Sequence, residues 1–376
     1  MKVFYNTEYV APAHAFETTR KSSQVAEAVT AGRVQGAELA DPQAIIDLCE
    51  ELIAQVHDPD YIKALKTGEP SHLAESQGFD WDPGIWSMAV NSTAGVLAAA
   101  EVAVATGRPS GSLSSGLHHA RYSNGSGYCT VNGLAVAARW ATARVAGHVT
   151  ILDTDAHCGG GTHQLLDDEE RILHLDLSVN SFDCYEPVGD NELSILINPD
   201  ETEYLAEVDR LLSRVPSDTE LLIYNAGMDP YPTVTRACLA ERERRVAQWC
   251  TEQRVPVVFV LAGGYLTALD MEGLVDLHLE TPRAFADHDH QTAPADLETF
   301  SKTRPGGWDG RLMAPQTDMS FPTPTTIWID DPAINQEDMD LLDEAGFHHE
   351  TRSSLGSIAQ SGPPDPRPSR RWSTTT

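Results

Sequence analysis

The residues best suited to chemistry form the pattern Asp-x-Asp-x-His at positions 153–157, between an apolar run and Gly159-Gly160-Gly161. Because side chains alternate along an extended chain, Asp153, Asp155 and His157 are expected to point the same way. Two carboxylates and an imidazole at a strand end could hold a divalent metal ion, which would relieve the cost of burying the acids. The alternative is an Asp-rich turn with a capping histidine, and the spacing alone leaves both open.

Three further motifs place reactive side chains directly after apolar or small-residue segments. The adjacent His118 and His119 could be metal ligands, or a base with an electrostatic partner, or a surface feature. Asp229 follows Asn-Ala-Gly-Met, and Tyr265 follows Ala-Gly-Gly. Each alone could be an ordinary loop residue. Together they offer metal ligands, two imidazoles and a hydroxyl donor.

The elements that would position these residues alternate in type along the chain. Short apolar runs predict buried strands, and amphipathic stretches between them predict helices. This order is typical of a doubly wound α/β fold, here a three-layer αβα arrangement around a mostly parallel sheet. Its functional residues are expected at the carboxyl ends of the strands. The predicted strands are 148–153, 171–179, 220–225 and 256–261, and the main predicted helices are 85–106, 204–215 and 235–254.

The charge balance restricts the partners. The chain of 376 residues has 26 basic and 56 acidic side chains and a formal charge of −30. Such a surface repels nucleic-acid phosphates and either attracts cationic substrates or only aids solubility. We find no uncharged apolar run of membrane-spanning length and no secretory signal, so we expect no membrane association. Six scattered cysteines without a Cys-x-x-Cys pair favour reduced thiols and a cytoplasmic location.

The periodic pattern weakens after about residue 281. We therefore predict one catalytic domain over residues 1–330, with a short strand near 325–330, and a C-terminal extension over 331–376. The extension is rich in Ser, Thr and Pro and is predicted to be disordered from about residue 351.

The ordered set of motifs resembles the zinc-dependent histone deacetylase family, which includes bacterial acetylpolyamine amidohydrolases and acetoin-utilisation proteins. The resemblance covers roughly residues 1–280 and implies the arginase/deacetylase fold. It implies zinc-dependent hydrolysis of an acyl amide on an acetylated lysine, polyamine or small-molecule amine. The motifs are His-His-Ala (118–120), Gly-Tyr-Cys-Thr-Val-Asn (127–132), Asp-Thr-Asp-Ala-His (153–157), Asn-Ala-Gly-Met-Asp (225–229) and Ala-Gly-Gly-Tyr (262–265).

By this resemblance Asp155, His157 and Asp229 would hold one zinc ion and leave a place for water and the substrate carbonyl. His118 and His119 would take a proton from the water and return it to the leaving amine. Each of these roles is implied by the matching motif position.

The resemblance also assigns supporting roles. Asp153 would accept a hydrogen bond from the first tandem histidine and help to hold a structural K⁺ ion, and Tyr265 would donate to the developing oxyanion. Tyr128 and Gly127 would line the substrate tunnel. Asp82, or Asp80 beside it, would hold the substrate at the rim.

Several positions depart from the family pattern. Cys158 and Gly160 stand where the family has histidine and aspartate or asparagine. The family residue matching Gly160 hydrogen-bonds the second tandem histidine, so His119 is expected to lack its usual partner unless a water or His163 substitutes. Asp176 aligns with the serine of the family's cation site. Residues 187–190 replace a Gly-Thr-Gly stretch, so one pocket wall should differ.

Two other functions use related residue patterns. A dinuclear manganese ureohydrolase of the arginase type needs further carboxylates at positions occupied by Gly159 and Tyr231, so a second metal ion would lack its ligands here. A non-catalytic metal- or ligand-binding member of the same fold stays open, with Gly160 as its support. The sequence leaves the oligomeric state open.

Overall fold

The computed structural model describes residues 1–11, 17–289, 327–329 and 349–351. The chain divides into two compact units, Met1–Met313 and Ala314–Thr376, and each is described by itself. In the second unit, strands β9 (Ile327–Ile329) and β10 (His349–Thr351) pair in parallel, and β9 coincides with the predicted strand near 325–330. The predicted domain boundary at 330/331 and the tail beyond 351 lie outside the described residues and stay predictions.

The first unit is built on an eight-stranded sheet with the order β2-β1-β3-β8-β7-β4-β5-β6. Every described pair in it is parallel, which confirms the predicted α/β class. The central strands match the predicted apolar runs, because strands covered on both faces need apolar side chains on both. The strands are β1 (Lys2–Phe4), β2 (Glu38–Ala40), β3 (Ser110–Ser112), β4 (His148–Asp153), β5 (Ile172–Ser178), β6 (Glu192–Ile195), β7 (Thr219–Asn225) and β8 (Val257–Val260).

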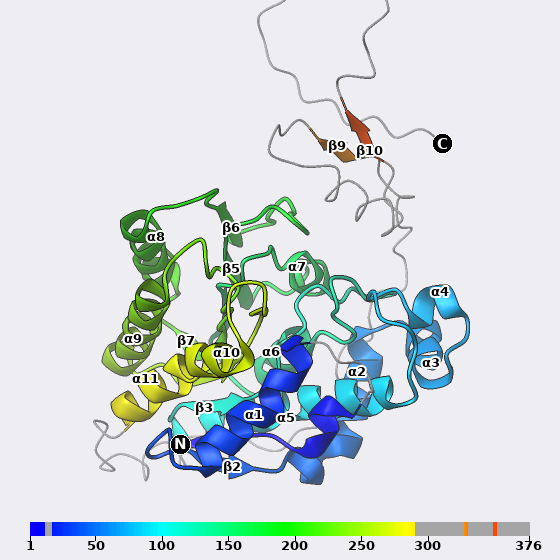
Figure 1. Cartoon of the computed structure of the whole chain (residues 1–376), viewed down its shortest axis with the longest axis horizontal. Helices are drawn as coiled ribbons and strands as arrows, with labels where there is room; N and C mark the ends of the chain where they lie inside the picture. Colours follow the sequence, from blue (N-terminus) through cyan, green and yellow to red (C-terminus); the bar gives the residue numbers. More distant parts are fainter. Residues whose placement is uncertain (12–16, 290–326, 330–348, 352–376) are drawn as a thin grey trace, which may run out of the picture. The chain divides into compact units, whose positions relative to one another are not determined.

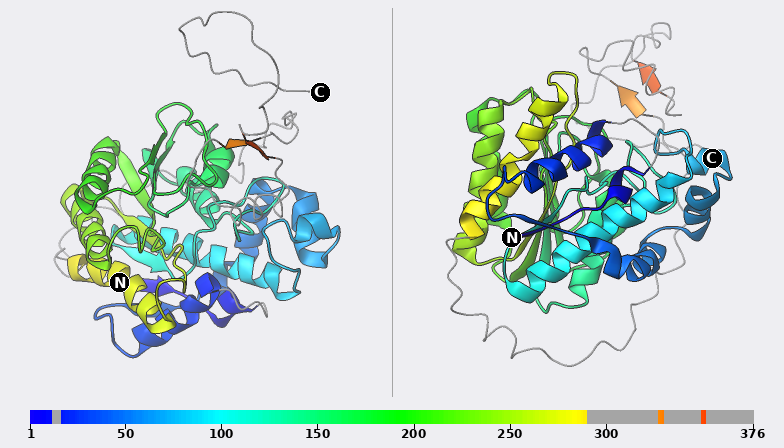
Figure 2. Two further views of the ribbon diagram at one scale, coloured as in Figure 1. Left: turned by 45° about the horizontal axis from the view of Figure 1, so that its top comes forward. Right: turned by 60° about the horizontal axis from the view of Figure 1, so that its bottom comes forward.

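Helices cover both faces of the sheet, and the right-hand view of Figure 2 shows the sheet between two helical layers. Alternate residues of β4 enter different cores, with Ile151 on one face and Leu152 on the other. The first core includes α2 (Ile46–Val56), α3 (Pro59–Thr67), α5 (Gly84–Thr106) and α6 (Gly133–Thr142); the second includes α1 (Glu17–Thr30), α8 (Glu201–Arg214), α9 (Arg236–Gln253), α10 (Met271–His278) and α11 (Glu280–Asp289). Short helices α4 (Ser71–Ala74), α7 (Gly160–Leu166), η1 (Thr7–Val10) and η2 (Pro42–Ile45) complete the unit.

Helix α5 is the longest of the helices that pack in the first core (Figure 1). By length and composition it is the one described helix that could cross a membrane, with a mean hydropathy of 1.5 over its 18-residue window. Of that window 83% is buried inside the protein. Glycine is required at position 95, because a Cβ there would overlap the Tyr9 hydroxyl. Burial in the core accounts for the apolar composition of this helix.

The strand register brings the predicted functional loops together. Asp153 at the end of β4 pairs with Asn225 at the end of β7, and Asn225 pairs with Val260 at the end of β8. Since the three strands are parallel neighbours, the loops that follow them leave the sheet at the same edge. Those loops carry the Asp-x-Asp-x-His pattern, Asp229 and Tyr265.

Candidate active site

Three buried or half-buried side chains form a cluster that could hold a metal ion. One ligand atom each from Asp155, His157 and Asp229 lies within 4.8 Å of the others. His157 Nδ1 is 3.2 Å from Asp155 Oδ1 and 3.2 Å from Asp229 Oδ2. Two ligands of a tetrahedral zinc ion, with bonds of about 2.0–2.1 Å, would lie about 3.3 Å apart. The spacing and the N/O donor set therefore fit zinc, with these three residues as its ligands.

The charges of the cluster also favour a cation. Burial and the neighbouring Asp155 raise the pKa of Asp229. Burial opposes charge on His157, but its contacts with the two carboxylates outweigh burial and raise its pKa to about 10. The imidazolium therefore lies between two acids that would otherwise repel each other. A metal ion bound there would take over this neutralisation and displace a proton.

The first tandem histidine has the partner that was predicted for it. His118 Nδ1 lies 2.8 Å from Asp153 Oδ2. Asp153 Oδ1 in turn accepts hydrogen bonds from Asn225 Nδ2 at 2.8 Å and from the Asp155 backbone N–H at 3.1 Å. Burial opposes a charge on His118, but the carboxylates of Asp153 and Asp155 outweigh it and raise the pKa of His118 to about 10. These contacts favour the protonated form of His118.

The second tandem histidine also has a carboxylate partner, which is supplied by Asp183 and not by position 160 or by the predicted substitute His163. His119 Nδ1 lies 2.9 Å from Asp183 Oδ2. His163, the predicted substitute, instead stacks on Tyr185 with ring centroids 4.2 Å apart. Burial, helped by the neighbouring His118, lowers the pKa of His119 to about 4 despite the Asp183 contact. His119 is therefore neutral at pH 7.

A narrow pocket of about 40 Å³ is lined by His118, by His119 and by Asp155 of the metal cluster. Its wall contains the predicted Tyr265, Tyr128 and Gly127 together with both tandem histidines. Burial and the charges of nearby acids raise the pKa of Tyr265, so its hydroxyl stays protonated and can donate. A Cβ on Gly127 would lie 2.4 Å from the His119 ring, so this position must be glycine. The complete lining is Ser115, Leu117, His118, His119, Gly127, Tyr128, Cys129, Asp155, Gly263 and Tyr265.

Besides Asp183, the sequence analysis did not predict Phe182 and Lys21, which also lie near the site. Phe182 places its ring edge-on, with centroid distances of 5.1 Å to His119 and 5.9 Å to His157. Lys21 is fully buried on α1 and donates to the Gly263 carbonyl; burial lowers its pKa to about 7. Neither stands in a motif, and the chain brings them to the site only through its tertiary fold.

Asp82 and Asp176, two other predicted site residues, make hydrogen bonds to backbone N–H groups. Asp82 Oδ1 accepts a hydrogen bond from the Gly84 backbone N–H at 2.7 Å, at the start of α5, and Asp82 does not line the pocket. Its role in substrate binding stays a prediction. Asp176 pairs with Asp153 across β4 and β5, and its carboxylate accepts from the Gly159 backbone N–H at 2.7 Å. A K⁺ ion held near Asp153 stays a prediction.

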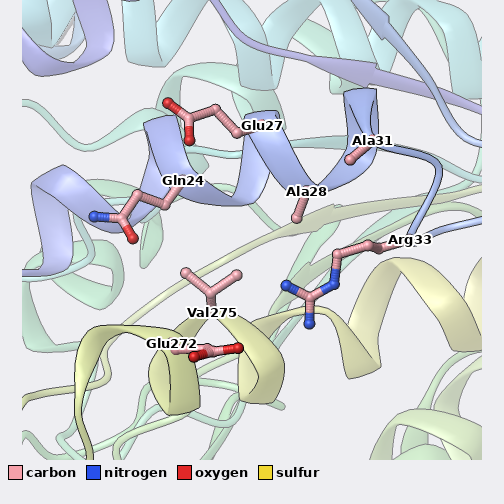
Figure 3. Close-up of a pocket in the computed structure, with 7 residues that line it drawn as sticks. All are labelled: Gln24, Glu27, Ala28, Ala31, Arg33, Glu272 and Val275. Atoms are coloured by element: carbon pink, nitrogen blue, oxygen red, sulfur yellow. The ribbon is translucent and has the colours of Figure 1, made fainter.

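A larger cavity of about 310 Å³ lies away from these groups, between α1 and α10 (Figure 3). Its lining contains neither a tandem histidine nor a residue of the metal cluster. The polar residues of this wall are Gln24, Glu27, Arg33 and Glu272, and the apolar ones are Ala28, Ala31 and Val275. The reactive groups are thus gathered at the smaller pocket.

The fold and this site agree with comparisons to known proteins. A family model of the histone deacetylase domain matches residues 14–280. The chain is 29% identical over 302 residues to an uncharacterized protein of Picosynechococcus sp., covering 76% of this chain and 98% of that protein. It is 28% identical over 236 residues to an acetylpolyamine amidohydrolase of Burkholderia pseudomallei, covering 56% of this chain and 67% of the relative. The chain belongs to the histone deacetylase family.

A solved structure supports the same fold. The crystal structure of an acetylpolyamine aminohydrolase from Burkholderia pseudomallei superposes with a TM-score of 0.61 at 22% identity, over 77% of this chain and 98% of that one. The fold is that of the arginase/deacetylase class. Family membership places the chain among hydrolases with deacetylase activity, which are generally metal-dependent and act on acetylated amines.

Proposed function

We propose that the protein is a zinc-dependent deacetylase that hydrolyses the amide of an acylated lysine, polyamine or small-molecule amine. One observation carries the proposal. The Asp155–His157–Asp229 cluster lies beside two adjacent histidines, each in contact with its own carboxylate and with pKa values shifted in opposite directions, at a pocket whose wall includes Tyr265. Pairs of titratable groups whose pKa values are pushed apart identify acid and base roles.

A zinc ion held by Asp155, His157 and Asp229 would polarise the substrate carbonyl and lower the pKa of a water molecule at the open position. His119 is neutral at pH 7 and serves as the base that takes a proton from that water. His118 stays cationic through its contact with Asp153 and stabilises the negative charge that develops. The proton held on His119 then passes to the leaving amine.

Tyr265 supplies a hydrogen bond to the developing oxyanion. A single donor of this kind contributes on the order of 3 kcal/mol to the transition state. Tyr128 and Phe182, whose side chains are 42% and 36% exposed, offer aromatic surface to an aliphatic stem. The formal charge of −30 favours substrates that carry a positive charge elsewhere, such as polyamines.

We also propose a cytoplasmic location, which free thiols on all six cysteines support. A non-catalytic role for this fold was supported only by Gly160 and its supposed loss of a partner for His119. The Asp183 contact removes that support. Catalysis is therefore the function that the geometry favours.

The test combines metal content with turnover. Protein purified without chelator is analysed by mass spectrometry for zinc and assayed for hydrolysis of an acetyl-lysine peptide and of acetylspermidine. We expect one zinc per chain and turnover of at least one substrate, which is lost in His119→Ala and retained in the surface variant His72→Ala. One zinc without turnover of any acyl amine would contradict the proposal, as would failure to bind zinc after reconstitution.

A further inference from the structure

Asp183 makes contacts that tie the second tandem histidine to the loop after β5. Its Oδ2 is 2.9 Å from His119 Nδ1 and also accepts from the Gly161 backbone N–H at 3.3 Å. Its Oδ1 accepts from the Arg121 guanidinium. The carboxylate is 95% buried, with 5% of the side chain exposed. A buried carboxylate with these donors holds a fixed position against the imidazole.

Gly160 provides the space that Asp183 occupies. A Cβ at position 160 would lie 2.4 Å from the Asp183 carbonyl oxygen and 2.7 Å from its Oδ1. No real side chain tolerates such contacts, so any residue other than glycine would displace the acid. Glycine at this position and the acid at position 183 therefore belong to one arrangement.

The loop that carries Asp183 is anchored to the loop that carries the metal cluster. The Cys158 backbone N–H donates to the Phe182 carbonyl at 3.0 Å, and the N–H groups of Val179 and Asn180 both donate to the Ala156 carbonyl. Asp183 itself has a φ of 60°, a left-handed conformation that aspartate tolerates better than most residues. These contacts fix the carboxylate relative to the cluster.

We propose that Asp183 is the positioning residue of His119. From the loop after β5 it accepts the hydrogen bond of His119 that the family resemblance assigns to a side chain at position 160. The inference rests on the proposed function. With Nδ1–H donated to Asp183, the ring presents Nε2 as the nitrogen that can exchange a proton in the pocket. The carboxylate also stabilises the imidazolium that forms when His119 has taken the proton.

A simpler role for Asp183 is to pair with Arg121, and the two roles predict different variants. Arg121 lies at the edge of the site with 30% of its side chain exposed. If the ion pair alone mattered, removing either partner would have the same effect. If Asp183 positions His119, its loss costs more than the loss of Arg121.

The central variant is Asp183→Asn, which keeps the shape and a residue that accepts the left-handed conformation. We expect kcat to fall about 10- to 100-fold with little change in KM, because the outer partner of a reacting imidazole is lost. Zinc content and melting temperature should stay at wild-type values. Asp190→Asn, which removes an exposed acid seven residues on, is the control and should leave kcat unchanged.

Two more pairs of variants distinguish positioning of His119 from pairing with Arg121. Arg121→Met is expected to lower kcat much less than Asp183→Asn. Gly160→Ala should lower kcat because its Cβ displaces Asp183, whereas Gly133→Ala, where a Cβ meets nothing closer than 3.5 Å, should not. Wild-type kcat in Asp183→Asn, or an equal loss in Arg121→Met, would overturn the inference while leaving the proposed function intact.

The hydrogen bond between His119 and Asp183 can also be detected by NMR. This measurement does not depend on turnover, so it tests the inference even if the protein hydrolyses no acyl amine and the proposed function fails. The Nδ1–H proton of His119, assigned by its loss in His119→Ala, should give a low-field NMR resonance. We expect this resonance to disappear in Asp183→Ala and to persist in Arg121→Met. Its persistence in Asp183→Ala would overturn the inference.

Discussion

Arg242 on α9 is a completely buried cation that connects the two loops of the metal cluster. Its guanidinium donates to the Thr154 carbonyl at 3.1 Å and to the Gly227 carbonyl at 2.7 Å. Thr154 precedes Asp155, and Gly227 lies two residues before Asp229. Its charge is balanced by buried Glu243, whose Oε1 accepts from Arg242 Nε at 2.8 Å.

Replacing Arg242 with methionine should have two separable consequences. Leaving Glu243 as an uncompensated buried charge destabilises the fold by about 3–5 kcal/mol. Losing the two carbonyl contacts frees the ligand loops, and we expect zinc affinity to fall about 10- to 100-fold, as for other outer partners of metal ligands. Arg245→Met on the same helix removes only partly exposed ion pairs and should cost less than about 1 kcal/mol.

The double variant Arg242→Met/Glu243→Gln separates charge balance from loop positioning. Glutamine removes the stranded charge and can still accept from the Tyr224 hydroxyl, which lies 2.8 Å from Glu243 Oε1. We expect most of the stability to return while zinc affinity stays low. Stability is measured by urea unfolding of the metal-free protein, and affinity by competition with a chelator. Wild-type zinc affinity in the double variant would refute the assignment of Arg242 as the anchor of the ligand loops.

Two further predictions concern the active site, and a third concerns buried His57. Tyr265→Phe should lower kcat about 100-fold or more with zinc content unchanged, since one oxyanion donor is lost; wild-type kcat would exclude that role. Zinc binding at pH 7 should release about one proton from His157, whose pKa is raised to about 10, measured by calorimetry in buffers of different ionisation enthalpy; no proton release would contradict the ligand set. Burial lowers the pKa of His57 to about 4, and its ring nitrogens contact the Arg121 carbonyl and the Asn132 backbone N–H. As the pH falls, the unfolded state binds a proton at this histidine before the folded state does, so the contribution of His57 to stability is complete above about pH 6.5 and decreases by about 3 kcal/mol towards pH 4. His57→Gln should therefore lose less stability in acid than the wild type, and an equal loss would refute the assignment to His57.

The sequence predicted strands β4, β5, β7 and β8 but not the shorter strands on either side of them, among them β3, which lies inside the sheet between β1 and β8. β4, β5, β7 and β8 are buried on both faces and therefore read as continuous apolar runs. β3 (Ser110–Ser112) has no apolar side chain, yet it is buried because Phe259 on the neighbouring strand packs over Gly111. A three-residue strand of this kind depends on its neighbours and leaves no periodic signal.

The active site also contains residues that the sequence predicted and residues that it did not. The family resemblance implied Asp155, His157 and Asp229 as the ligand set, and the predicted strand ends placed these residues at one edge of the sheet. The partner of His119 could not be predicted from position 160, because Asp183 reaches it through the conformation of another loop. Contacts made between loops depend on tertiary structure, whereas residues within one strand-to-loop junction are fixed by local spacing.

The most direct test of zinc-dependent amide hydrolysis at this site is a zinc titration of metal-depleted protein, with acetate release from an acetyl-lysine peptide or from acetylspermidine as the readout. We predict that activity rises linearly and saturates at one zinc per chain, and that Asp229→Asn fails to reach it. Full hydrolysis by the metal-depleted protein, or no acetate release from either substrate at one bound zinc per chain, would contradict the account.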